Sequence, residues 1–356
     1  MTNLHSLHDS FGVSPWLDNL SRELITSGQL QEFVNNGVRG VTSNPSIFEK
    51  AFTDGTHYKE PFTALKGQGL STEQAYWRLA VEDIQNACDV LRQVYDQSAK
   101  DDGYVSLEVS PETAQDAQAT IDQAKELWAK VNRPNLMIKI PATEACLPAI
   151  TEVLALGINV NVTLIFSLHR YLQVINAYMQ GLERLGDPSQ VRSVASFFIS
   201  RVDSDIDPKL TEHEVLKGMA AVAQARAAYG IFLESFNSHA ERWSSLEARG
   251  AKPQKALWAS TSTKDPNYPD LKYVDGLLAK DSVNTLPNAT IDAILDHADF
   301  VALHSLNAEE IELAHEQLAE LLYVGIHMQD VSARLEKEGL EKFQQAFHTM
   351  LSALES

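Results

Sequence analysis

Short apolar segments rich in β-branched residues alternate along the chain with longer amphipathic segments, and this alternation restricts the fold more than any other feature. It is typical of parallel strands joined by helices. Eight strands joined in this way fit either a closed (β/α)8 barrel or an open doubly wound sheet. We expect strands at residues 14–18, 38–44, 103–109, 135–141, 158–166, 194–202, 255–261 and 281–287, with 299–304 as a competing candidate.

Helix signals lie between these strands. Ser71 and Gln74 form a capping box ahead of the amphipathic segment 75–95, which predicts a helix that begins there. The tail 308–356 is almost continuously helix-forming, and it is expected to pack across the outside or to reach over a barrel end. Further helices are expected from about Thr143 to Leu156 with Gly157 as the stop, after Ser167, and within 211–240.

A length of 356 residues permits one large α/β domain or two ordinary ones. The sequence contains no internal repeat, no low-complexity segment and no Gly/Ser linker. We therefore expect a single domain over residues 1–356, with 308–356 as a helical extension packed on it.

The chain is acidic, with 29 Lys and Arg against 48 Asp and Glu and a formal charge of −19. Such a surface repels nucleic acid and anionic lipid, so neither is an expected partner. A small phosphorylated substrate is still compatible, because salt screens surface fields beyond about 8 Å and a few cations can dominate inside a cleft. Those cations must then be specific residues.

Cysteine content and the N-terminal segment indicate a cytoplasmic protein. Only Cys88 and Cys146 are present, without a C-x-x-C pair, so neither a disulfide framework nor a cysteine zinc site is expected. The first residues lack a basic region followed by an apolar stretch, and no window approaches a membrane span.

Nucleotide and metal signatures such as G-x-G-x-x-G, G-x-x-x-x-G-K-[ST] and H-E-x-x-H are absent. This argues against a dehydrogenase, a kinase or a zinc hydrolase, and we expect no cofactor and no metal. Polar residues instead gather at the carboxyl ends of predicted strands, where barrel enzymes build their active sites. Each alone reads as a cap or turn residue, but together they indicate a site: Asp18, Asn44, Glu108, Lys139, Thr163, Ser196, Arg201 and Ser260.

Lys139 is the most informative, because Met137, Ile138, Ile140 and Pro141 surround it in the strand. An ammonium buried there without a partner would cost several kcal/mol. In a structural interpretation the side chain snorkels or pairs with a carboxylate. In a chemical one, burial near other cations lowers the pKa of a lysine, and the neutral amine attacks a carbonyl carbon to form a Schiff base.

Catalysis through such an imine needs no metal or organic cofactor, because the protonated imine itself withdraws electrons from the carbon chain. It does need an acid/base group that shuttles protons during imine formation, and a second base for the hydroxyl whose bond cleaves. Asp18 and Glu108 are the two carboxylates available at strand ends.

Several sequence blocks resemble the transaldolase family. “VTSNPSIF”, “GYVSLEVSP”, “LMIKIPAT” and “NVTLIFSLHRY” are similar to its signature blocks in order and spacing. “SRELITSGQLQEFV” near the start and the later “LWASTSTKDPNYPDLKYVDGLLA” resemble its longer bacterial branch. The resemblance implies a (β/α)8 TIM barrel of the class I aldolase type that moves a dihydroxyacetone unit between sugar phosphates in the non-oxidative pentose phosphate pathway.

By motif position, the resemblance also implies roles. Lys139 would form the Schiff base, and Asp18 would be the base for C–C cleavage. Glu108 would act through a water held by Thr163. Asn44 would hold substrate hydroxyl groups.

The resemblance further implies that Ser196 lines the pocket and that Arg201 binds the substrate phosphate, to which guanidinium geometry is well suited. The alternative for Arg201 is a salt bridge with Asp203 or Asp205. Phe198 sits where transaldolases carry a phenylalanine and the related fructose 6-phosphate aldolases do not, which favours transfer over simple aldol cleavage.

The chain departs from the shorter transaldolases after the seventh strand, where they show a serine followed closely by a second phosphate-binding arginine. Ser260 aligns with the serine, but no arginine follows in “ASTSTKDP”. Lys264 is either the replacement or an ordinary exposed lysine. Its ammonium would act as a point charge and bind phosphate less selectively.

Three functional hypotheses follow. The first is a transaldolase that acts on small sugar phosphates as a monomer or homodimer. The second is a fructose 6-phosphate aldolase-like enzyme that releases free dihydroxyacetone. The third is an inactive barrel that serves as a binding or scaffold protein, against which stands the joint presence of the lysine and both carboxylates.

Overall fold

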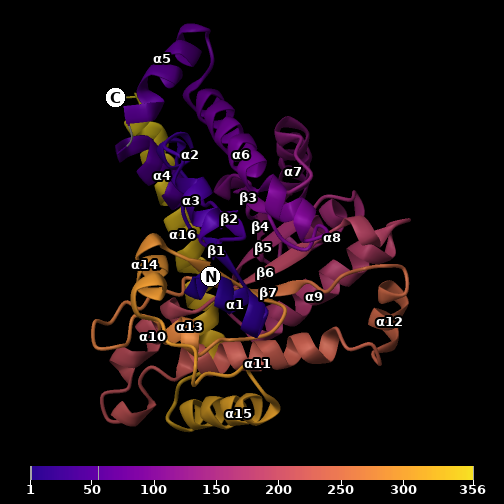
Figure 1. The fold of residues 1–356 in the computed structure, drawn as a ribbon, viewed down its shortest axis with the longest axis vertical. Coiled ribbons are helices and arrows are strands. Elements are labelled where there is room, and N and C mark those ends of the chain that lie inside the picture. The colour runs from indigo at the N-terminus through magenta and orange to yellow at the C-terminus, as the bar shows by residue number, and fades with distance from the viewer. Residues whose placement is uncertain (1, 55, 356) are drawn as a thin grey trace.

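The eight predicted strands form one closed parallel barrel in the computed structural model, which describes residues 2–54 and 56–355 (Figure 1). Each strand pairs with the next, and the last pairs with the first from Val13↔Ser282 to Leu17↔Leu286. The barrel is therefore confirmed over the open sheet. Its strands are β1 (Val13–Leu17), β2 (Gly40–Thr42), β3 (Val105–Glu108), β4 (Leu136–Pro141), β5 (Val160–Ile165), β6 (Ser193–Phe198), β7 (Lys255–Ala259) and β8 (Ser282–Leu286).

Helices surround the barrel and carry the chain from each strand to the next. The strands are buried on both faces, since they meet side chains inside the barrel and helices outside it. The helices are α1 (Asn3–Phe11), α2 (Arg22–Thr26), α3 (Gln29–Asn35), α4 (Pro45–Asp54), α5 (Lys59–Gly67), α6 (Thr72–Gln97), α7 (Ala117–Val131), α8 (Leu147–Ala155), α9 (Leu168–Glu183), α10 (Ser200–Ile206), α11 (Ala220–Ser235), α12 (Glu241–Glu247), α13 (Lys272–Asp275), α14 (Asn288–His297), α15 (Ala308–Tyr323) and α16 (Met328–Glu355).

The predicted helix starts at Ser71 and Ser167 are confirmed. The Gln74 amide donates to Ser71 Oγ at 3.1 Å, and the Ser71 amide donates to Gln74 Oε1 at 2.9 Å, which completes the capping box of α6. Ser167 caps α9 by accepting a hydrogen bond from the Arg170 amide at 3.0 Å. Both caps satisfy amides that the first helical turn leaves unpaired.

Two sequence predictions are wrong in detail. The segment 299–304 is no strand, because β8 already pairs with both β1 and β7 and the closed sheet offers no free edge. The helix expected from Thr143 begins at Leu147. The Thr143 hydroxyl donates to the Ala114 carbonyl at 2.7 Å and accepts from the Cys146 amide at 3.1 Å, so this stretch forms a turn.

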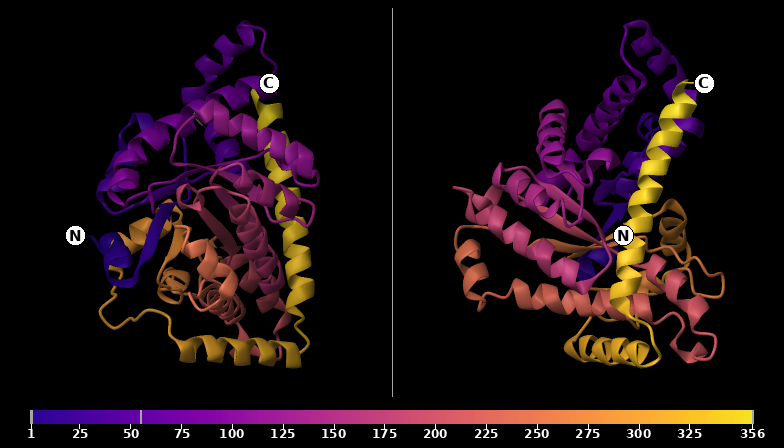
Figure 2. Two further views of the ribbon diagram at one scale, coloured as in Figure 1. Left: turned by 90° about the vertical axis from the view of Figure 1, so that its right-hand side faces the viewer. Right: turned by 180° about the vertical axis from the view of Figure 1, so that it is seen from behind.

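The C-terminal tail forms two helices, α15 and α16. The longer helix α16 lies along one side of the molecule and reaches the region of α4 (Figure 2). It contacts α4, α10 and β5, whose neighbouring loops belong to the carboxyl end of the barrel. The sequence left open whether the tail packs across the outside of the barrel or reaches over one of its ends. The contacts of α16 show that part of the tail reaches the carboxyl end.

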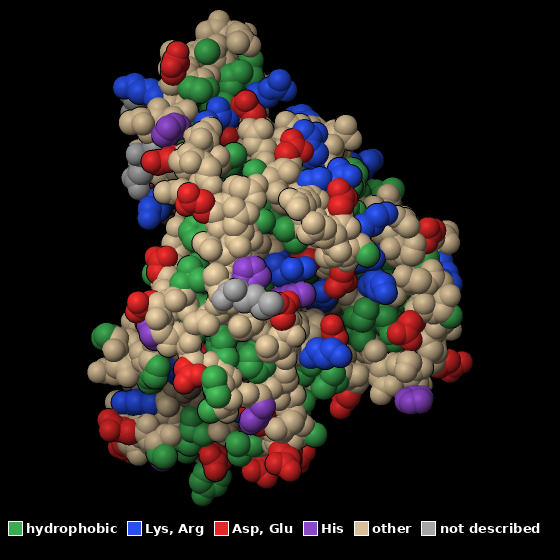
Figure 3. Space-filling model, in the orientation of Figure 1, with side chains coloured by type: hydrophobic (Ala, Val, Ile, Leu, Met, Phe, Trp, Pro, Cys, Tyr) green, Lys and Arg blue, Asp and Glu red, His purple; other side chains and the backbone are tan. Residues whose placement is uncertain are grey.

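No helix within residues 2–54 and 56–355 is both long and apolar enough to cross a membrane. On the face shown in Figure 3, acidic side chains are scattered rather than gathered in one patch. This distribution agrees with the large negative formal charge of −19.

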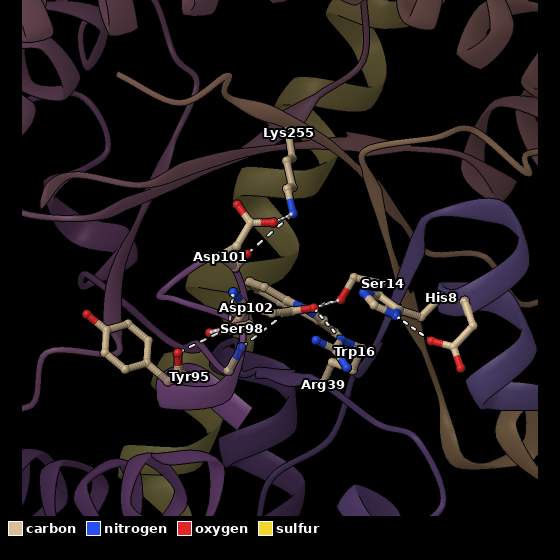
Figure 4. Close-up of polar contacts among 11 residues, drawn as sticks. His8, Ser14, Trp16, Arg39, Tyr95, Ser98, Asp101, Asp102 and Lys255 are labelled. Carbon is tan, nitrogen blue, oxygen red and sulfur yellow. Dashed lines mark hydrogen bonds and ion pairs between the residues drawn. The ribbon is translucent and has the colours of Figure 1, made fainter. Parts of the chain in front are cut away.

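A polar cluster around Asp102 ties together the amino-terminal ends of the first three strands (Figure 4). The buried Asp102 carboxylate accepts from Trp16 Nε1 at 2.8 Å, from Arg39 Nε at 2.7 Å and from the Ser14 hydroxyl. The charge is therefore compensated by a cation and by neutral donors. Nearby, Asp101 pairs with Lys255 at 2.7 Å at a more exposed position.

Replacing Asp102 should test the weight of this cluster. Asp102→Ala leaves the Arg39 guanidinium without its carboxylate and leaves the Trp16 indole N–H only the Ser14 hydroxyl, at 3.2 Å, as acceptor, so the free energy of unfolding should fall by about 3–5 kcal/mol. The matched control Asp101→Ala removes only an exposed ion pair and should cost at most about 1 kcal/mol. Urea unfolding followed by tryptophan fluorescence measures both. Equal losses in the two variants would contradict a stabilising cluster at Asp102.

Candidate active site

Nine of the ten predicted site residues line one cavity of about 160 Å³ at the carboxyl ends of the strands. Strand alternation explains the four residues that lie in strands (Lys139, Thr163, Ser196 and Phe198), because every second side chain of a barrel strand points inward. The other five follow a strand end, and Arg201 lies in the first turn of α10. The tenth residue, Glu108, lies beside the cavity and reaches it through Lys139. The nine are Asp18, Asn44, Lys139, Thr163, Ser196, Phe198, Arg201, Ser260 and Lys264.

Lys139 lies in the interior of the barrel and is only 5% exposed. The parallel register of β3 and β4 places it opposite Glu108, and its Nζ lies 3.2 Å from Glu108 Oε2. The same Nζ donates to the Ser43 carbonyl at 3.2 Å. The structural interpretation, an ion pair with a carboxylate, is thus partly correct. However, the amine and its partner lie at the cavity, so the pair does not remove the lysine from the site.

Two carboxyl groups flank this lysine. Burial raises the pKa of Asp18 above its ordinary value, while the Lys139 ammonium and a hydrogen bond from Thr42 Oγ1 at 2.8 Å oppose the shift. Burial also raises the pKa of Glu108, again against the Lys139 ammonium. Both carboxyls therefore hold protons more tightly than in water, as acid/base groups that work near neutral pH require.

A chain of hydrogen bonds lies one layer deeper in the barrel. The Ser196 hydroxyl donates to Asn161 Oδ1 at 2.7 Å, and Asn161 Nδ2 donates to Ser106 Oγ at 3.0 Å. Asn161 lies two positions before Thr163 in β5, and Ser106 lies two positions before Glu108 in β3, so each shares the inward face of its strand with a predicted site residue. The alternation of side chains along a strand could therefore have identified both. They fix the orientation of Ser196 at the cavity wall.

The hydroxyl of Thr163 is buried and has no hydrogen-bond partner within 2–54 and 56–355. The next residue, Leu164, adopts a left-handed backbone with φ +59°, at the point where the register between β5 and β6 shifts. Ser260, after β7, is also left-handed, with φ +57°. Such conformations are costly for residues with side chains and concentrate at functional sites.

Asn44 has the local role that was expected of a strand-end asparagine. Its Oδ1 accepts from the Ile47 amide at 3.0 Å and so caps the first turn of α4. The residue also lines the cavity, so the cap fixes the side chain beside the lysine.

Arg201 does not form the salt bridge that was the alternative to phosphate binding. Asp203 pairs with Lys272 at 2.9 Å and Asp205 pairs with Arg334, whereas the described residues offer Arg201 no ion pair. Its guanidinium carbon lies 5.2 Å from the centre of the Phe198 ring. Nη1 is buried without a hydrogen bond in the described structure, so this group is stacked and has donor capacity to spare.

Lys264 lies across the cavity mouth, where Nζ donates to Ser262 Oγ at 2.6 Å. Burial and the neighbouring Arg201 guanidinium lower its pKa. Lys264 and Arg201 line the same cavity, and Lys264 is among the exposed residues.

A wider cleft of about 620 Å³ adjoins the cavity and shares Asp18 and Asn44 with it. Lys50 and His57 line its outer part. Apart from Asp18 and Asn44, the residues of this cleft were not predicted from the sequence, because they come from separate elements, among them α2, α4 and α14, and are brought together only by folding.

Within 2–54 and 56–355, no group of three or more His, Cys, Asp or Glu side chains is arranged to hold a metal ion. The site itself presents one amine, two carboxyls with raised pKa, hydroxyl and amide groups, and two cationic side chains.

The raised pKa of Asp18 has a consequence for stability. A carboxyl whose folded-state pKa is raised contributes stability at low pH that is lost as pH rises through that pKa. Asp18→Asn should therefore increase the free energy of unfolding at pH 8 by about 1 kcal/mol, and the gain should shrink toward pH 4. Urea titrations at the two pH values measure this, with exposed Asp292→Asn as the control. A gain independent of pH would contradict the assignment.

Comparison with known proteins agrees with this geometry. The family model described as Transaldolase/Fructose-6-phosphate aldolase matches residues 15–354. A transaldolase of Saccharopolyspora erythraea is 46% identical over 99% of this chain and 97% of that protein. One of Renibacterium salmoninarum is 48% identical over 99% and 96%. A protein named Transaldolase 2 from Nostoc sp. is 46% identical over 97% and 95%. The chain belongs to the transaldolase/fructose-6-phosphate aldolase family.

Proposed function

We propose that this protein is a transaldolase that moves a dihydroxyacetone unit from sedoheptulose 7-phosphate to glyceraldehyde 3-phosphate, giving erythrose 4-phosphate and fructose 6-phosphate in the non-oxidative pentose phosphate pathway. The observation that carries the proposal is the buried Lys139 amine beside two carboxyls in one cavity. The relatives named transaldolase support it, since they match nearly the whole chain.

Imine formation is the first chemical step. The neutral Lys139 amine bonds to C2 of the ketose, and the carbonyl oxygen takes a proton to give a carbinolamine. A second proton converts the hydroxyl to water, which leaves as the C=N bond forms. We assign this proton transfer to Glu108, 3.2 Å from Nζ, through a water held by the Thr163 hydroxyl. The raised pKa of Glu108 suits a group that both gives and takes protons near neutral pH.

Bond cleavage follows. Asp18 takes the proton of the C4 hydroxyl, the C3–C4 bond breaks, and its electron pair moves toward the protonated imine to form an enamine. The aldehyde product leaves, and the acceptor aldehyde reacts with the enamine in the reverse sequence. Asp18 lines the cavity, and the Thr42 hydrogen bond at 2.8 Å fixes its carboxylate.

The remaining residues would hold the substrate. Asn44 and Ser196 contact hydroxyl groups near the imine. Arg201 binds the phosphate, with Lys264 as a second cation and Ser260 as a hydroxyl donor. Phe198 stacks on Arg201 and favours transfer over release of free dihydroxyacetone.

We also propose that residues 1–356 form one domain and that the protein works in the cytoplasm as a monomer or homodimer. The packing of α16 against the carboxyl end of the barrel supports a single domain. The free, buried thiols of Cys88 and Cys146 agree with a reducing compartment.

The decisive experiment traps the imine. Incubation with fructose 6-phosphate and borohydride should add one three-carbon unit to the peptide that contains Lys139. Lys139→Met should lose the adduct and reduce transfer at least about 10⁴-fold, while Lys255→Met, at the opposite barrel end, should form the adduct. Absence of an adduct at saturating donor would refute the transaldolase assignment. Free dihydroxyacetone without an aldehyde acceptor would instead identify an aldolase.

Lys264 is tested by charge removal. Lys264→Gln should raise KM for fructose 6-phosphate about threefold to tenfold, because a point charge near the phosphate is lost, and leave KM for unphosphorylated fructose unchanged. Exposed Lys252→Gln is the control for net charge. If both donors respond equally, or if neither does, Lys264 is not a phosphate ligand.

A further inference from the structure

The buried face of α16 forms part of the cavity wall. Phe343 of this helix lines the same cavity as Lys139 and Arg201, although it lies far from both in the sequence. Gly339 stands one helical turn before Phe343, so both residues face the barrel. The helix is therefore in direct contact with the site.

Gly339 lies in the interior of a 28-residue helix, where glycine is less favourable than alanine by about 1 kcal/mol. Its backbone faces the machinery at close range. A Cβ built at this position would lie 3.1 Å from Leu164 Cδ2, 3.4 Å from Arg201 Nη1 and 3.6 Å from Phe166 Cε2. A side chain here would thus press on Leu164 and reach Arg201.

Two side chains in the turns before Gly339 attach α16 to the rest of the protein. The buried Ser332 hydroxyl donates to the Phe166 carbonyl at 2.6 Å, two turns before Gly339. Arg334 Nε donates to Asp205 Oδ1 at 2.9 Å. These contacts attach α16 to the loop after β5 and to α10, the helix that carries Arg201.

Leu164 and Arg201, two of the three neighbours of Gly339, come from β5 and from the helix that follows the adjacent strand β6. Leu164 follows Thr163 and has a left-handed backbone at the register shift of β5. Arg201 is placed between the Phe198 ring, 5.2 Å from its guanidinium carbon, and the α16 backbone. The Arg201 guanidinium therefore lies next to the space that a side chain at position 339 would fill.

We propose that Gly339 is a positioning residue: its lack of a side chain lets α16 pack against Arg201 and so sets where the guanidinium meets the phosphate of the substrate. This inference rests on the proposed function, because it takes Arg201 as the phosphate ligand. It assigns to the C-terminal helix a role in recognising the phosphorylated end of the donor.

A graded series tests it. Gly339→Ala should raise KM for fructose 6-phosphate about threefold and Gly339→Val more than about tenfold, since a displaced guanidinium loses its aligned hydrogen bonds. The kcat should change less than about twofold, and KM for unphosphorylated fructose should stay the same. Gly67→Ala is the matched control, because a Cβ there meets nothing within 4 Å.

A double variant separates positioning from general damage. Arg201→Lys replaces the stacked guanidinium with a shorter, unstacked ammonium. If Gly339 acts through Arg201, adding Gly339→Ala to Arg201→Lys should change KM for fructose 6-phosphate less than about twofold relative to Arg201→Lys alone. Equal losses for both donors, or additive effects in the double variant, would overturn the proposal. Failure of the proposed function would look different, since the unmodified protein would then form no borohydride adduct at Lys139.

Discussion

The pairing of Lys139 with Glu108 inside the barrel is the interaction on which the site depends. An amine that is to bond with a carbonyl carbon must be shielded from water, yet a buried ammonium needs a compensating charge. The register of β3 and β4 supplies that charge, because Glu108 Oε2 lies 3.2 Å from Lys139 Nζ. Asp18 adds a second carboxyl, and burial raises the pKa of both acids. Both carboxyls therefore hold their protons more tightly than in water, next to the amine that is to react.

The chemistry and the binding of charge are separated in space. The amine and carboxyls come from β1, β3 and β4, whereas Arg201 and Lys264 follow β6 and β7. The amine and carboxyls suit proton transfer and bond formation at a carbonyl carbon, while the two cations of the cavity suit an anionic group. A chain with a formal charge of −19 thus needs only two local cations to receive a phosphate, because fields from the outer surface are screened within about 8 Å.

Local sequence signals predicted the strands and most of the site, because each of those residues lies in or directly after a strand and all parallel strands end on one side of the barrel. The roles came from the family resemblance. Thr42 and Asn161 were missed, since their importance depends on partners in other strands. Phe343 and Gly339 could not be found at all: only the tertiary packing of α16 brings them to the cavity.

Both ends of the barrel keep buried polar atoms without a hydrogen bond among the described residues; at the amino end these are Asn135 Oδ1, Arg192 Nε and Gln254 Oε1. At the amino end, the buried carboxylate of Asp102 accepts hydrogen bonds from Ser14, Trp16 and Arg39. At the carboxyl end, Thr163 and Arg201 retain buried polar atoms without hydrogen bonds among the described residues. Unsatisfied groups and raised carboxyl pKa values lower stability, but they leave donors and acids available to a substrate. The hydrogen bonds of the Asp102 cluster and the apolar core offset this cost, so the carboxyl end can keep its reactive groups within a stable barrel.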